Sequence, residues 1–266
     1  MATNIHPAAF VSPKAEIADG VTIGPCACVD ENVVIGEGSR IDGFATIRPY
    51  TKIGRNSHVF SYAMVGEIPQ DLKFGGEVSY LEIGDNTRIR EFATLHRGTE
   101  GGGGLTRVGD NCLLMAYTHV AHDCRVGSNV IMSNNATLAG HVEVGDYAII
   151  GGLTAVHQFV RVGRNAFVGG FSGLGMDLPP YMLASGPRAG LHGPNAVGLR
   201  RLNLPRESIA AIRGVFRLIW LSGTPRQEAM EKAAAEYSAV PEVREILEFV
   251  RSSQRGVLSA DRETSG

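Results

Sequence analysis

Aliphatic residues recur at every sixth position along most of the first 174 residues of the chain. The series runs from Val11 through Ile17, Ile23, Val29, Ile35, Ile41, Ile47, Ile53, Val59 and Val65, resumes at Ile83, Ile89 and Leu95, and continues unbroken from Val108 to Leu174. Neither an α-helix, with a period of about 3.6 residues, nor an alternating strand, with a period of 2, matches this spacing. A fixed six-residue repeat is typical of a parallel β-helix, an all-β solenoid.

A hexad is too short for a strand and a crossover helix, so each should form a short strand and a turn. Three hexads then make one triangular coil, and the chain returns 18 residues later, displaced by one strand spacing of about 4.8 Å. The aliphatic positions of successive coils stack into buried ladders. Because no hexad can bury its apolar side alone, we expect the array to fold as a unit.

Two segments interrupt the repeat, near residues 66–82 and 98–107. The hexads resume after each, so both segments should be loops that leave a solenoid which itself continues. Long excursions of this kind are usually functional, although a tolerated surface insertion is the alternative. The two interruptions therefore indicate where to look for a site.

The repeat ends after Leu174, and the sequence predicts a β-helix over residues 1–187 followed by a small helical domain over residues 188–266. Residues 178–204 look irregular. One helix is predicted from an apolar stripe formed by Ile209, Ile212, Val215, Phe216 and Ile219. Gly223 should end it, Thr224–Gln227 reads as a capping box for the next helix, and a last helix should follow Pro241. We expect the tail after Gly256 to be frayed.

Composition narrows the class of protein. The formal net charge of -2 offers no field for nucleic acid or for an anionic membrane surface. No stretch of about 18 apolar residues exists, and the first residues lack the features of a signal peptide, so a cytoplasmic protein with no membrane span is expected. The four cysteines, Cys26, Cys28, Cys112 and Cys124, are poorly spaced for zinc and are expected to be reduced.

Histidine is the informative residue type, because five of the eight histidines lie between residues 96 and 157. The 18-residue step places Gly140 one coil beyond His122, with His141 beside it, and Gln158 or His157 one coil beyond His141. Such a cluster could transfer protons or bind a metal. His122 is followed by Asp123, which could support a base only if a turn lies between the two residues. The histidines could also merely cap turns.

Four motifs make the resemblance specific: His119-Val-Ala-His-Asp-Cys124, Asn134-Asn-Ala-Thr-Leu-Ala-Gly-His141, Gly151-Gly-Leu-Thr-Ala-Val-His-Gln-Phe159 and Ile89-Arg-Glu-Phe-Ala-Thr-Leu-His-Arg-Gly-Thr99. In this order, and over nearly the whole chain, the sequence resembles the acyl-ACP–UDP-N-acetylglucosamine O-acyltransferases. The resemblance implies a left-handed coil, although parallel crossovers are usually right-handed. It also implies transfer of a 3-hydroxyacyl chain from the phosphopantetheine of acyl carrier protein to the glucosamine 3-hydroxyl of UDP-N-acetylglucosamine, the first step of lipid A biosynthesis. Homotrimers with a site between subunits, and no metal or tightly bound cofactor, are implied as well.

The resemblance also assigns roles to residues. It implies that His122 is the general base, Asp123 its support or a substrate contact, and the Gly140 N–H an oxyanion donor. The implied substrate contacts are Asp71 and Lys73 in the first loop, His119, His141, His157 and Gln158 in the pocket, and Asn195, Arg200 and Arg201 at the nucleotide end. Gly170 matches the position that limits acyl-chain length. The chain departs from the family at Ala196-Val197, where an acidic residue is expected near the uridine.

Several alternatives stay open. Some relatives acylate a 3-amino sugar in place of the 3-hydroxyl sugar, and the sequence does not decide the acyl-chain length. The sister N-acyltransferase of the pathway normally carries an extra domain before its hexads, whereas the hexads here begin by residue 11. The γ-class carbonic anhydrases use a similar solenoid to bind zinc through three histidines. A non-catalytic scaffold or ice-binding face would need repeated threonines in place of the arginines, histidines and acidic residues seen here.

Overall fold

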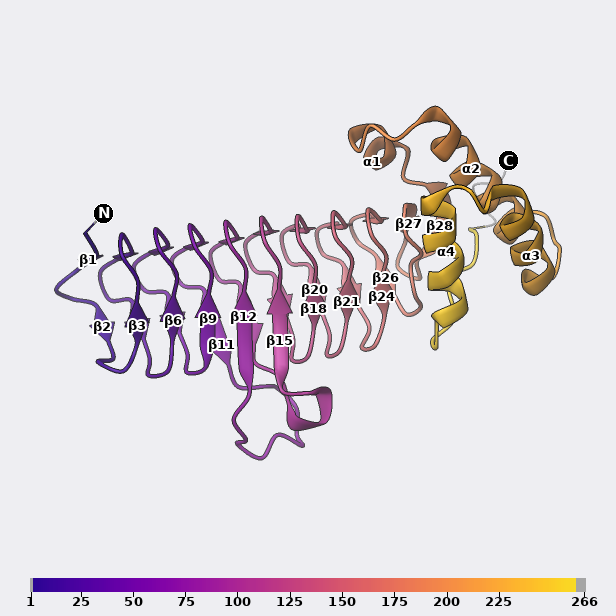
Figure 1. Ribbon diagram of the computed structural model, residues 1–266. Coiled ribbons are helices and arrows are strands. Elements are labelled where there is room, and N and C mark those ends of the chain that lie inside the picture. The colour runs from indigo at the N-terminus through magenta and orange to yellow at the C-terminus, as the bar shows by residue number, and fades with distance from the viewer. Residues whose placement is uncertain (1, 262–266) are drawn as a thin grey trace.

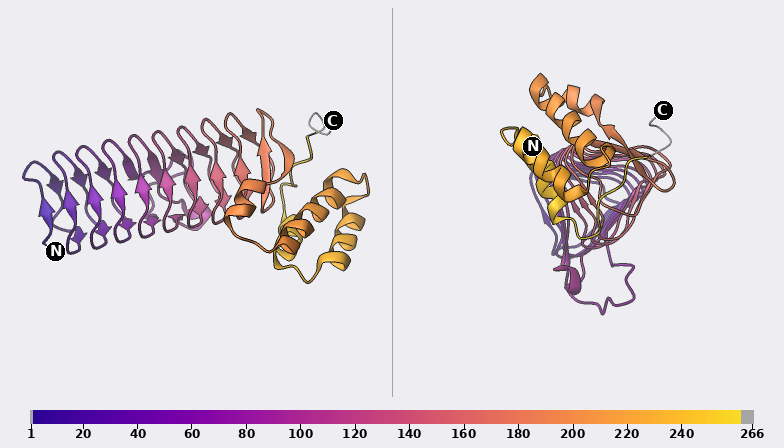
Figure 2. Two further views of the ribbon diagram at one scale, coloured as in Figure 1. Left: turned by 90° about the horizontal axis from the view of Figure 1, so that it is seen from above. Right: turned by 90° about the vertical axis from the view of Figure 1, so that its right-hand side faces the viewer.

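The computed structural model describes residues 2–261, which form a long solenoid with a group of helices at its C-terminal end (Figure 1). Strands are short and follow one another around three sheets in the repeating order A, B, C. Seen end-on in Figure 2, the solenoid is triangular. In Figure 1 the coil advances from left to right while the near strands run upward, so it is left-handed. The predicted left-handed parallel β-helix is confirmed.

Sheet A has 11 strands among the described residues. They are β1 (Asn4–Ile5), β4 (Thr22–Ile23), β7 (Arg40–Ile41), β10 (His58–Val59), β13 (Arg88–Ile89), β16 (Leu113–Leu114), β19 (Ile131–Met132), β22 (Ile149–Ile150), β25 (Phe167–Val168), β27 (Met182–Ser185) and β28 (Gly190–Pro194). All pair in parallel except β27 with β28, which is antiparallel.

Sheets B and C have nine and eight strands among the described residues. Sheet B contains β2 (Phe10–Val11), β5 (Cys28–Val29), β8 (Thr46–Ile47), β11 (Met64–Glu67), β14 (Thr94–His96), β17 (His119–Val120), β20 (Thr137–Leu138), β23 (Ala155–Val156) and β26 (Gly173–Leu174). Sheet C contains β3 (Glu16–Ile17), β6 (Val34–Ile35), β9 (Thr51–Ile53), β12 (Tyr80–Ile83), β15 (Leu105–Val108), β18 (Arg125–Val126), β21 (Glu143–Val144) and β24 (Arg161–Val162).

The every-sixth aliphatic residues are the inward side chains of these strands. From Ile23 onward they are buried, whereas Val11 and Ile17 are only partly buried because the first coil has a neighbouring coil on one side alone among the described residues. In the uninterrupted part of the solenoid, strand partners lie 18 residues apart, as in His119 with Thr137. The ladders predicted from the repeat therefore exist and form the core.

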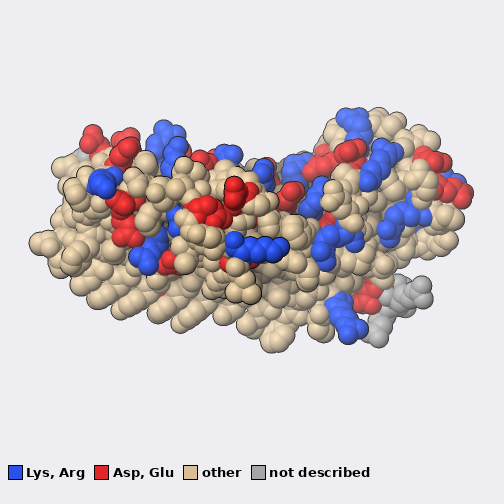
Figure 3. Space-filling view, turned by 90° about the horizontal axis from the view of Figure 1, so that it is seen from below, with Lys and Arg blue, Asp and Glu red and all other residues tan. Residues whose placement is uncertain are grey.

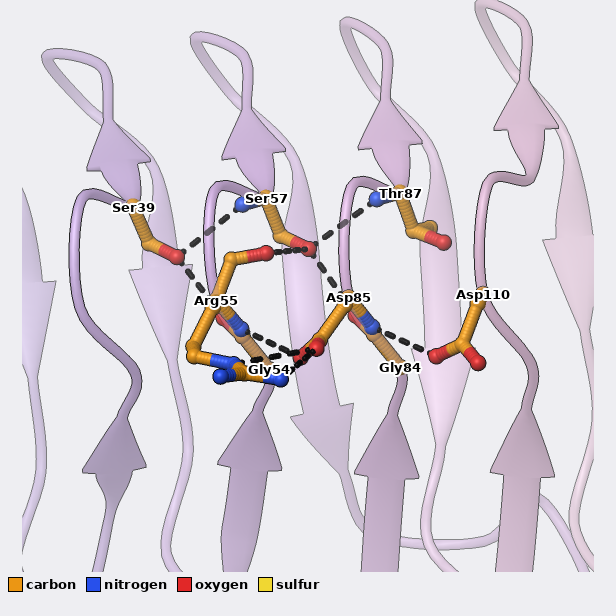
Figure 4. A network of polar contacts seen from close by, with 8 residues as sticks. All are labelled: Ser39, Gly54, Arg55, Ser57, Gly84, Asp85, Thr87 and Asp110. Carbon is orange, nitrogen blue, oxygen red and sulfur yellow. Dashed lines mark hydrogen bonds and ion pairs between the residues drawn. The ribbon is translucent and has the colours of Figure 1, made fainter.

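The three edges of the triangle are named by the sheets that they join: A–B, B–C and C–A. The C–A edge holds a relay of inward hydroxyls (Figure 4). Ser57 donates a hydrogen bond to the carbonyl of Gly84 over 2.9 Å and accepts one from the Thr87 N–H over 3.0 Å. Ser39 does the same one coil earlier, with Gly54 and the Ser57 N–H. Buried turn groups are thereby paired from one coil to the next.

A second row of contacts lies on the outside of the same edge. The Asp85 carboxylate accepts hydrogen bonds from the Arg55 N–H and the Arg55 guanidinium, and the Asp110 carboxylate accepts one from the Asp85 N–H over 2.7 Å (Figure 4). These carboxylates satisfy backbone donors of neighbouring turns. The row is structural rather than a site.

Both interruptions leave the solenoid at the B–C edge. Strands extend a few residues into the predicted segments, so the loops cover residues 68–79, between β11 and β12, and residues 97–104, between β14 and β15. The second loop contains one short 3-10 turn, η1 (Glu100–Gly102). The coil continues beyond each loop, as the resumed repeat predicts.

The prediction that residues 178–204 are irregular was wrong. This segment contains β27, β28 and α1 (Ala196–Arg201), because its hydrophobic residues close the end of the solenoid: Leu178, Tyr181, Met182, Ala184 and Leu191 are all buried. The remaining helical elements are α2 (Arg206–Phe216), the π-helical turn η2 (Arg217–Leu221), α3 (Arg226–Tyr237) and α4 (Pro241–Ser252). No helix within residues 2–261 has the length and apolar character needed to cross a bilayer.

Two smaller predictions at the C-terminus also need correction. The capping box at Thr224–Gln227 does not form: Pro225 occupies the N-cap of α3, without a side-chain hydrogen bond, because Thr224 lies one residue too early. The tail after Gly256 is ordered as far as Asp261, since Val257 and Leu258 are buried and the backbone pairs with Asp177 and Leu191. Residues 262–266 lie outside the described part.

Candidate active site

The B–C edge collects most of the predicted site residues. His122 and Asp123 form the turn between β17 and β18, and Gly140 and His141 form the equivalent turn one coil further, between β20 and β21. Both loops emerge from this same edge, which is the lower vertex in the end-on view of Figure 2. The sequence repeat predicted that the histidines cluster on adjacent coils, and the structure adds that both loops leave from the same edge.

His122 and Asp123 make a direct side-chain contact. Asp123 has a φ of 60°, a left-handed conformation that Asp tolerates better than most residues, so a tight turn separates it from His122. His122 Nδ1 lies 2.8 Å from Asp123 Oδ2, and the Asp123 side chain is only 1% exposed. With Nδ1 as donor to the carboxylate, His122 Nε2 is left as the proton acceptor. The turn between His122 and Asp123 that the sequence analysis required is therefore present.

Thr99 in the second loop also binds the Asp123 carboxylate. The Thr99 N–H donates to Asp123 Oδ1 over 2.9 Å, and its hydroxyl donates to Oδ2 over 2.7 Å. The Asp123 N–H is itself bound by the Thr106 hydroxyl over 2.7 Å. The buried carboxylate therefore accepts two hydrogen bonds from Thr99 and faces His122 Nδ1, with His141 Nδ1 further away at 3.8 Å from Oδ2.

Gly140 and His141 lie directly beyond the pair. The His141 N–H donates to the His122 carbonyl over 3.1 Å, which fixes the 18-residue step at this point. A Cβ on Gly140 would lie 2.6 Å from His122 Cε1, so only glycine lets the imidazole sit against the backbone. The His141 ring is perpendicular to that of His122, with centroids 5.1 Å apart.

His141 is stacked on Phe159, with centroids 4.4 Å apart. The prediction that Gln158 or His157 lies one coil beyond His141 was wrong by one or two residues. The Phe159 N–H donates to the Gly140 carbonyl, so Phe159 follows His141 and Gln158 is aligned with Gly140.

Burial lowers the pKa of His141, while the carboxylates of Asp123 and Asp71 partly oppose that effect. Asp71 lies in the first loop, which leaves the solenoid at this same edge.

A second histidine pair lies beside the first. His96 and His119 meet edge to face at 4.9 Å, and Thr94 Oγ1 lies 2.7 Å from His119 Nδ1. Burial lowers the pKa of His96 to about 4, and the neighbouring His119 adds to the effect. Burial likewise lowers the pKa of His119. Both rings are therefore neutral at pH 7, which suits packing and hydrogen bonding rather than charge.

Comparison with known proteins gives the same family along the whole chain. A family model described as UDP-N-acetylglucosamine O-acyltransferase, domain 2, matches residues 177–258, and a model of six bacterial transferase hexapeptides matches residues 105–140. An acyl-[acyl-carrier-protein]–UDP-N-acetylglucosamine O-acyltransferase from Thermodesulfovibrio yellowstonii is 46% identical over 95% of this chain and 98% of its own. The chain belongs to this O-acyltransferase family.

Two more members of the O-acyltransferase family support the assignment. The enzyme of that name from Aquifex aeolicus is 62% identical over 75% of this chain and 76% of its own. The solved structure of UDP-N-acetylglucosamine acyltransferase from Campylobacter jejuni is 40% identical, with a TM-score of 0.92 over 97% of this chain and 100% of that one. The similarity includes the C-terminal helices as well as the hexads.

Other residues that the O-acyltransferase resemblance singled out lie on the same edge as His122. Asp71 and Lys73 are in the first loop, where Asp71 Oδ1 accepts a hydrogen bond from the Lys73 N–H over 3.0 Å. His157 and Gln158 are exposed in the turn after β23, one coil beyond Gly140. Their side chains face solvent in the single chain.

Four residues lie on other edges of this O-acyltransferase. Gly170 is in the A–B turn between β25 and β26. Asn195 caps α1 and donates to the carbonyl of Asn165 in a C–A turn, while Arg200 and Arg201 are exposed on the same helix. Within one chain these residues do not meet His122.

Sequence reasoning missed three residues of the cluster. Thr99 and Gly102 belong to the second interruption, and only the fold shows that this loop bends back onto Asp123. Phe159 could have been found, because it lies 18 residues after His141. The glycine run 101–104 was a signal of close backbone packing that the repeat alone could not interpret.

Proposed function

We propose that this protein transfers a 3-hydroxyacyl chain from the phosphopantetheine thiol of acyl carrier protein to the glucosamine 3-hydroxyl of UDP-N-acetylglucosamine, the first step of lipid A biosynthesis. The names of the relatives, which are similar over nearly the full chain, support the substrates. The observation that carries the chemistry is the buried Asp123 carboxylate 2.8 Å from His122 Nδ1. It makes His122 a supported base at an edge flanked by two loops.

The reaction is a direct attack on the thioester. His122 Nε2 takes the proton of the sugar hydroxyl as that oxygen bonds to the thioester carbonyl carbon, and Asp123 stabilises the imidazolium that forms. The carbonyl oxygen becomes an oxyanion that accepts a hydrogen bond from the Gly140 N–H, for which no acceptor is found among the described residues. The intermediate then collapses, the C–S bond breaks, and the leaving thiolate takes the proton from His122.

Replacement of His122 tests this mechanism. We expect His122→Ala to lose about 10²- to 10⁴-fold in turnover, the usual contribution of a general base, while its oligomeric state is unchanged. The assay uses purified protein, acyl carrier proteins loaded with a range of 3-hydroxyacyl chains, and both 3-hydroxyl and 3-amino UDP-sugars, with mass spectrometry of the products. Wild-type turnover by the variant would eliminate the proposed base. The product masses also identify the acyl-chain length and the acceptor sugar.

A metal site is the second arrangement that the cluster allows. Ligand atoms of His122, Asp123 and His141 all lie within 4.8 Å of one another. Against this use, both Asp123 oxygens accept hydrogen bonds from Thr99, and His122 Nδ1 is directed at the same carboxylate. We therefore propose catalysis without a cofactor. Activity should survive EDTA, and loss of activity on chelation with recovery on adding Zn²⁺ would favour the metal site.

A homotrimer completes the proposed site. Leu113, Ile131, Ile149 and Phe167 form an apolar row on the outside of sheet A. The outward residues of sheet B carry no Lys, Arg or Asp, and their one Glu among the described residues is Glu67, at the end of β11. Charge instead gathers over sheet C, on the upper side of Figure 3. Packing sheet B of one copy on sheet A of the next, around the A–B edges, gives a closed threefold ring. The C–A edge of one copy, with Asn195, Arg200 and Arg201, then lies beside His122 of its neighbour.

A further inference from the structure

The loop of residues 97–104 contacts the proposed catalytic pair directly, through two hydrogen bonds from Thr99 to the Asp123 carboxylate. We infer that Thr99 is a positioning residue for the His122–Asp123 pair, and that this loop acts as a clamp on the Asp123 carboxylate. The inference rests on the proposed base catalysis. It assigns the second interruption of the repeat to orientation of the base, while the first loop, with Asp71 and Lys73, stays the substrate loop.

The contacts of Thr99 are two donors to one buried carboxylate. Its N–H reaches Oδ1 over 2.9 Å and its hydroxyl reaches Oδ2 over 2.7 Å. The Oδ2 atom is the same oxygen that lies 2.8 Å from His122 Nδ1. Thr99 therefore fixes the rotation of the carboxylate, and it shares the acceptor that orients the imidazole.

The loop is built to hold Thr99 in this place. The Thr99 hydroxyl accepts a hydrogen bond from the Gly102 N–H over 3.2 Å, and the Thr99 carbonyl accepts one from the Gly104 N–H over 2.7 Å. Gly103 and Gly104 have φ values of 93° and 75°, which glycine adopts without strain. The hydroxyl is thus oriented by a donor from its own loop and directed at Asp123.

The glycines also bring the loop backbone onto the carboxylate. A Cβ on Gly102 would lie 2.0 Å from Asp123 Cγ, whereas a Cβ on the adjacent Gly101 would meet no atom within 4 Å. One loop therefore offers a pair of neighbouring glycines of which only one touches the catalytic carboxylate. This contrast gives a matched control for the clamp.

Removal of the Thr99 hydroxyl would change the electrostatic surroundings of His122. His122 is faced by Asp123, by His141 at 5.1 Å between rings, and by the His96–His119 pair. Loss of the Thr99 hydroxyl leaves Oδ2 as a stronger acceptor for His122 Nδ1 at 2.8 Å, with His141 Nδ1 further away at 3.8 Å, which favours the His122 imidazolium. Because the base works only when neutral, the low-pH limb of kcat against pH should move to higher pH.

Four variants test the clamp: Thr99→Val, Thr99→Ser, Gly102→Ala and Gly101→Ala. We expect Thr99→Val and Gly102→Ala to lower kcat about 10- to 100-fold, with little change in KM for the UDP-sugar, because the base is misplaced while the pocket is intact. Thr99→Val should also shift the low-pH limb. Thr99→Ser, which keeps the hydroxyl, and Gly101→Ala should behave as wild type.

The outcomes separate this inference from the proposed mechanism. Wild-type kcat and pH dependence in both Thr99→Val and Gly102→Ala, with His122→Ala inactive, would overturn the clamp and leave the base intact. Retained turnover in His122→Ala would remove the mechanism itself. If Thr99→Val loses its circular-dichroism spectrum, the Gly101→Ala and Gly102→Ala pair still decides the question.

Discussion

At the scale of single residues, the proposed chemistry depends on the turn between His122 and Asp123. Adjacent residues on an extended strand point in opposite directions. Here the left-handed φ of 60° at Asp123 brings its carboxylate back to 2.8 Å from His122 Nδ1. The same backbone position is occupied by His141 one coil later and by Phe159 after that. The β-helix turn therefore repeats the same left-handed position in successive coils at this edge.

Gly140 provides the sharpest test at this scale. Gly140→Ala would place a Cβ 2.6 Å from His122 Cε1, so the imidazole must shift. We expect a loss of about 100-fold in kcat/KM, the cost of misplacing a reacting group by roughly 1 Å. Gly175→Ala is the control, because its Cβ would meet no atom within 4 Å. Equal activity of the two variants would mean that His122 needs no contact with this turn.

His96 makes folding stability depend on pH. Burial lowers the pKa of His96 from 6.5 to about 4, because the folded protein favours the neutral imidazole. The stability that the neutral His96 contributes is therefore fully present above about pH 6.5 and is lost as the pH falls toward 4. His96→Gln should reduce the loss of unfolding free energy between pH 7 and pH 4.5 by roughly 2 to 3 kcal/mol. Urea unfolding at matched protein concentration measures this difference. His6→Gln, at an exposed position, is the control, and an unchanged pH dependence in His96→Gln would contradict the prediction.

At the scale of elements, the hydroxyl relay of the C–A edge holds successive coils together. Ser57→Ala removes the acceptor of the Thr87 N–H and the donor to Gly84, both inside the solenoid. Leaving such buried groups unpaired should lower the free energy of unfolding by about 1 to 3 kcal/mol. Denaturant unfolding measures the change, with Ser61→Ala, in an A–B turn, as the control. Equal unfolding midpoints of the two variants would show that the relay is not stabilising.

The six-residue repeat predicts where the two loops leave the solenoid but not how they fold. The interruptions were visible in the sequence because the aliphatic period stops at Val65 and Leu95 and resumes at Ile83 and Val108. Their shared edge follows from counting hexads. The contact of Thr99 with Asp123 does not follow, because it depends on how residues 97–104 fold back, which the φ values of Gly103 and Gly104 permit.

At the scale of the whole molecule, an aromatic stack marks the A–B edge. Phe44, Tyr62, Phe92 and Tyr117 stack in successive coils with centroids 5.2, 5.2 and 4.9 Å apart. Each side chain is about half exposed, at 50, 51, 44 and 55%. A continuous exposed apolar surface of this kind commonly marks a protein interface. The stack lies on the edge that the proposed threefold axis would contact.

A charge placed in this stack should disrupt the assembly. We expect Tyr62→Glu to convert the proposed trimer to monomers in light scattering, because three carboxylates would be brought together and desolvated. Activity should fall with the trimer, since Asn195, Arg200 and Arg201 would no longer reach a neighbouring His122. Lys52→Glu, on the charged face of sheet C, is the control. A trimeric, active Tyr62→Glu protein would exclude this packing.

The sequence by itself determined the solenoid, its coil length, the two loops and the edge that carries His122, because each follows from a six-residue period and from side-chain direction in short strands. It also indicated the family, through motifs that keep their order along the chain. Only the tertiary structure decided which atoms meet. These contacts include the Thr99 clamp, the stacking of His141 on Phe159, and the ordered strands and tail between Leu178 and Asp261. They depend on how individual turns fold and on the contacts that close the end of the solenoid, and neither follows a repeat in the sequence.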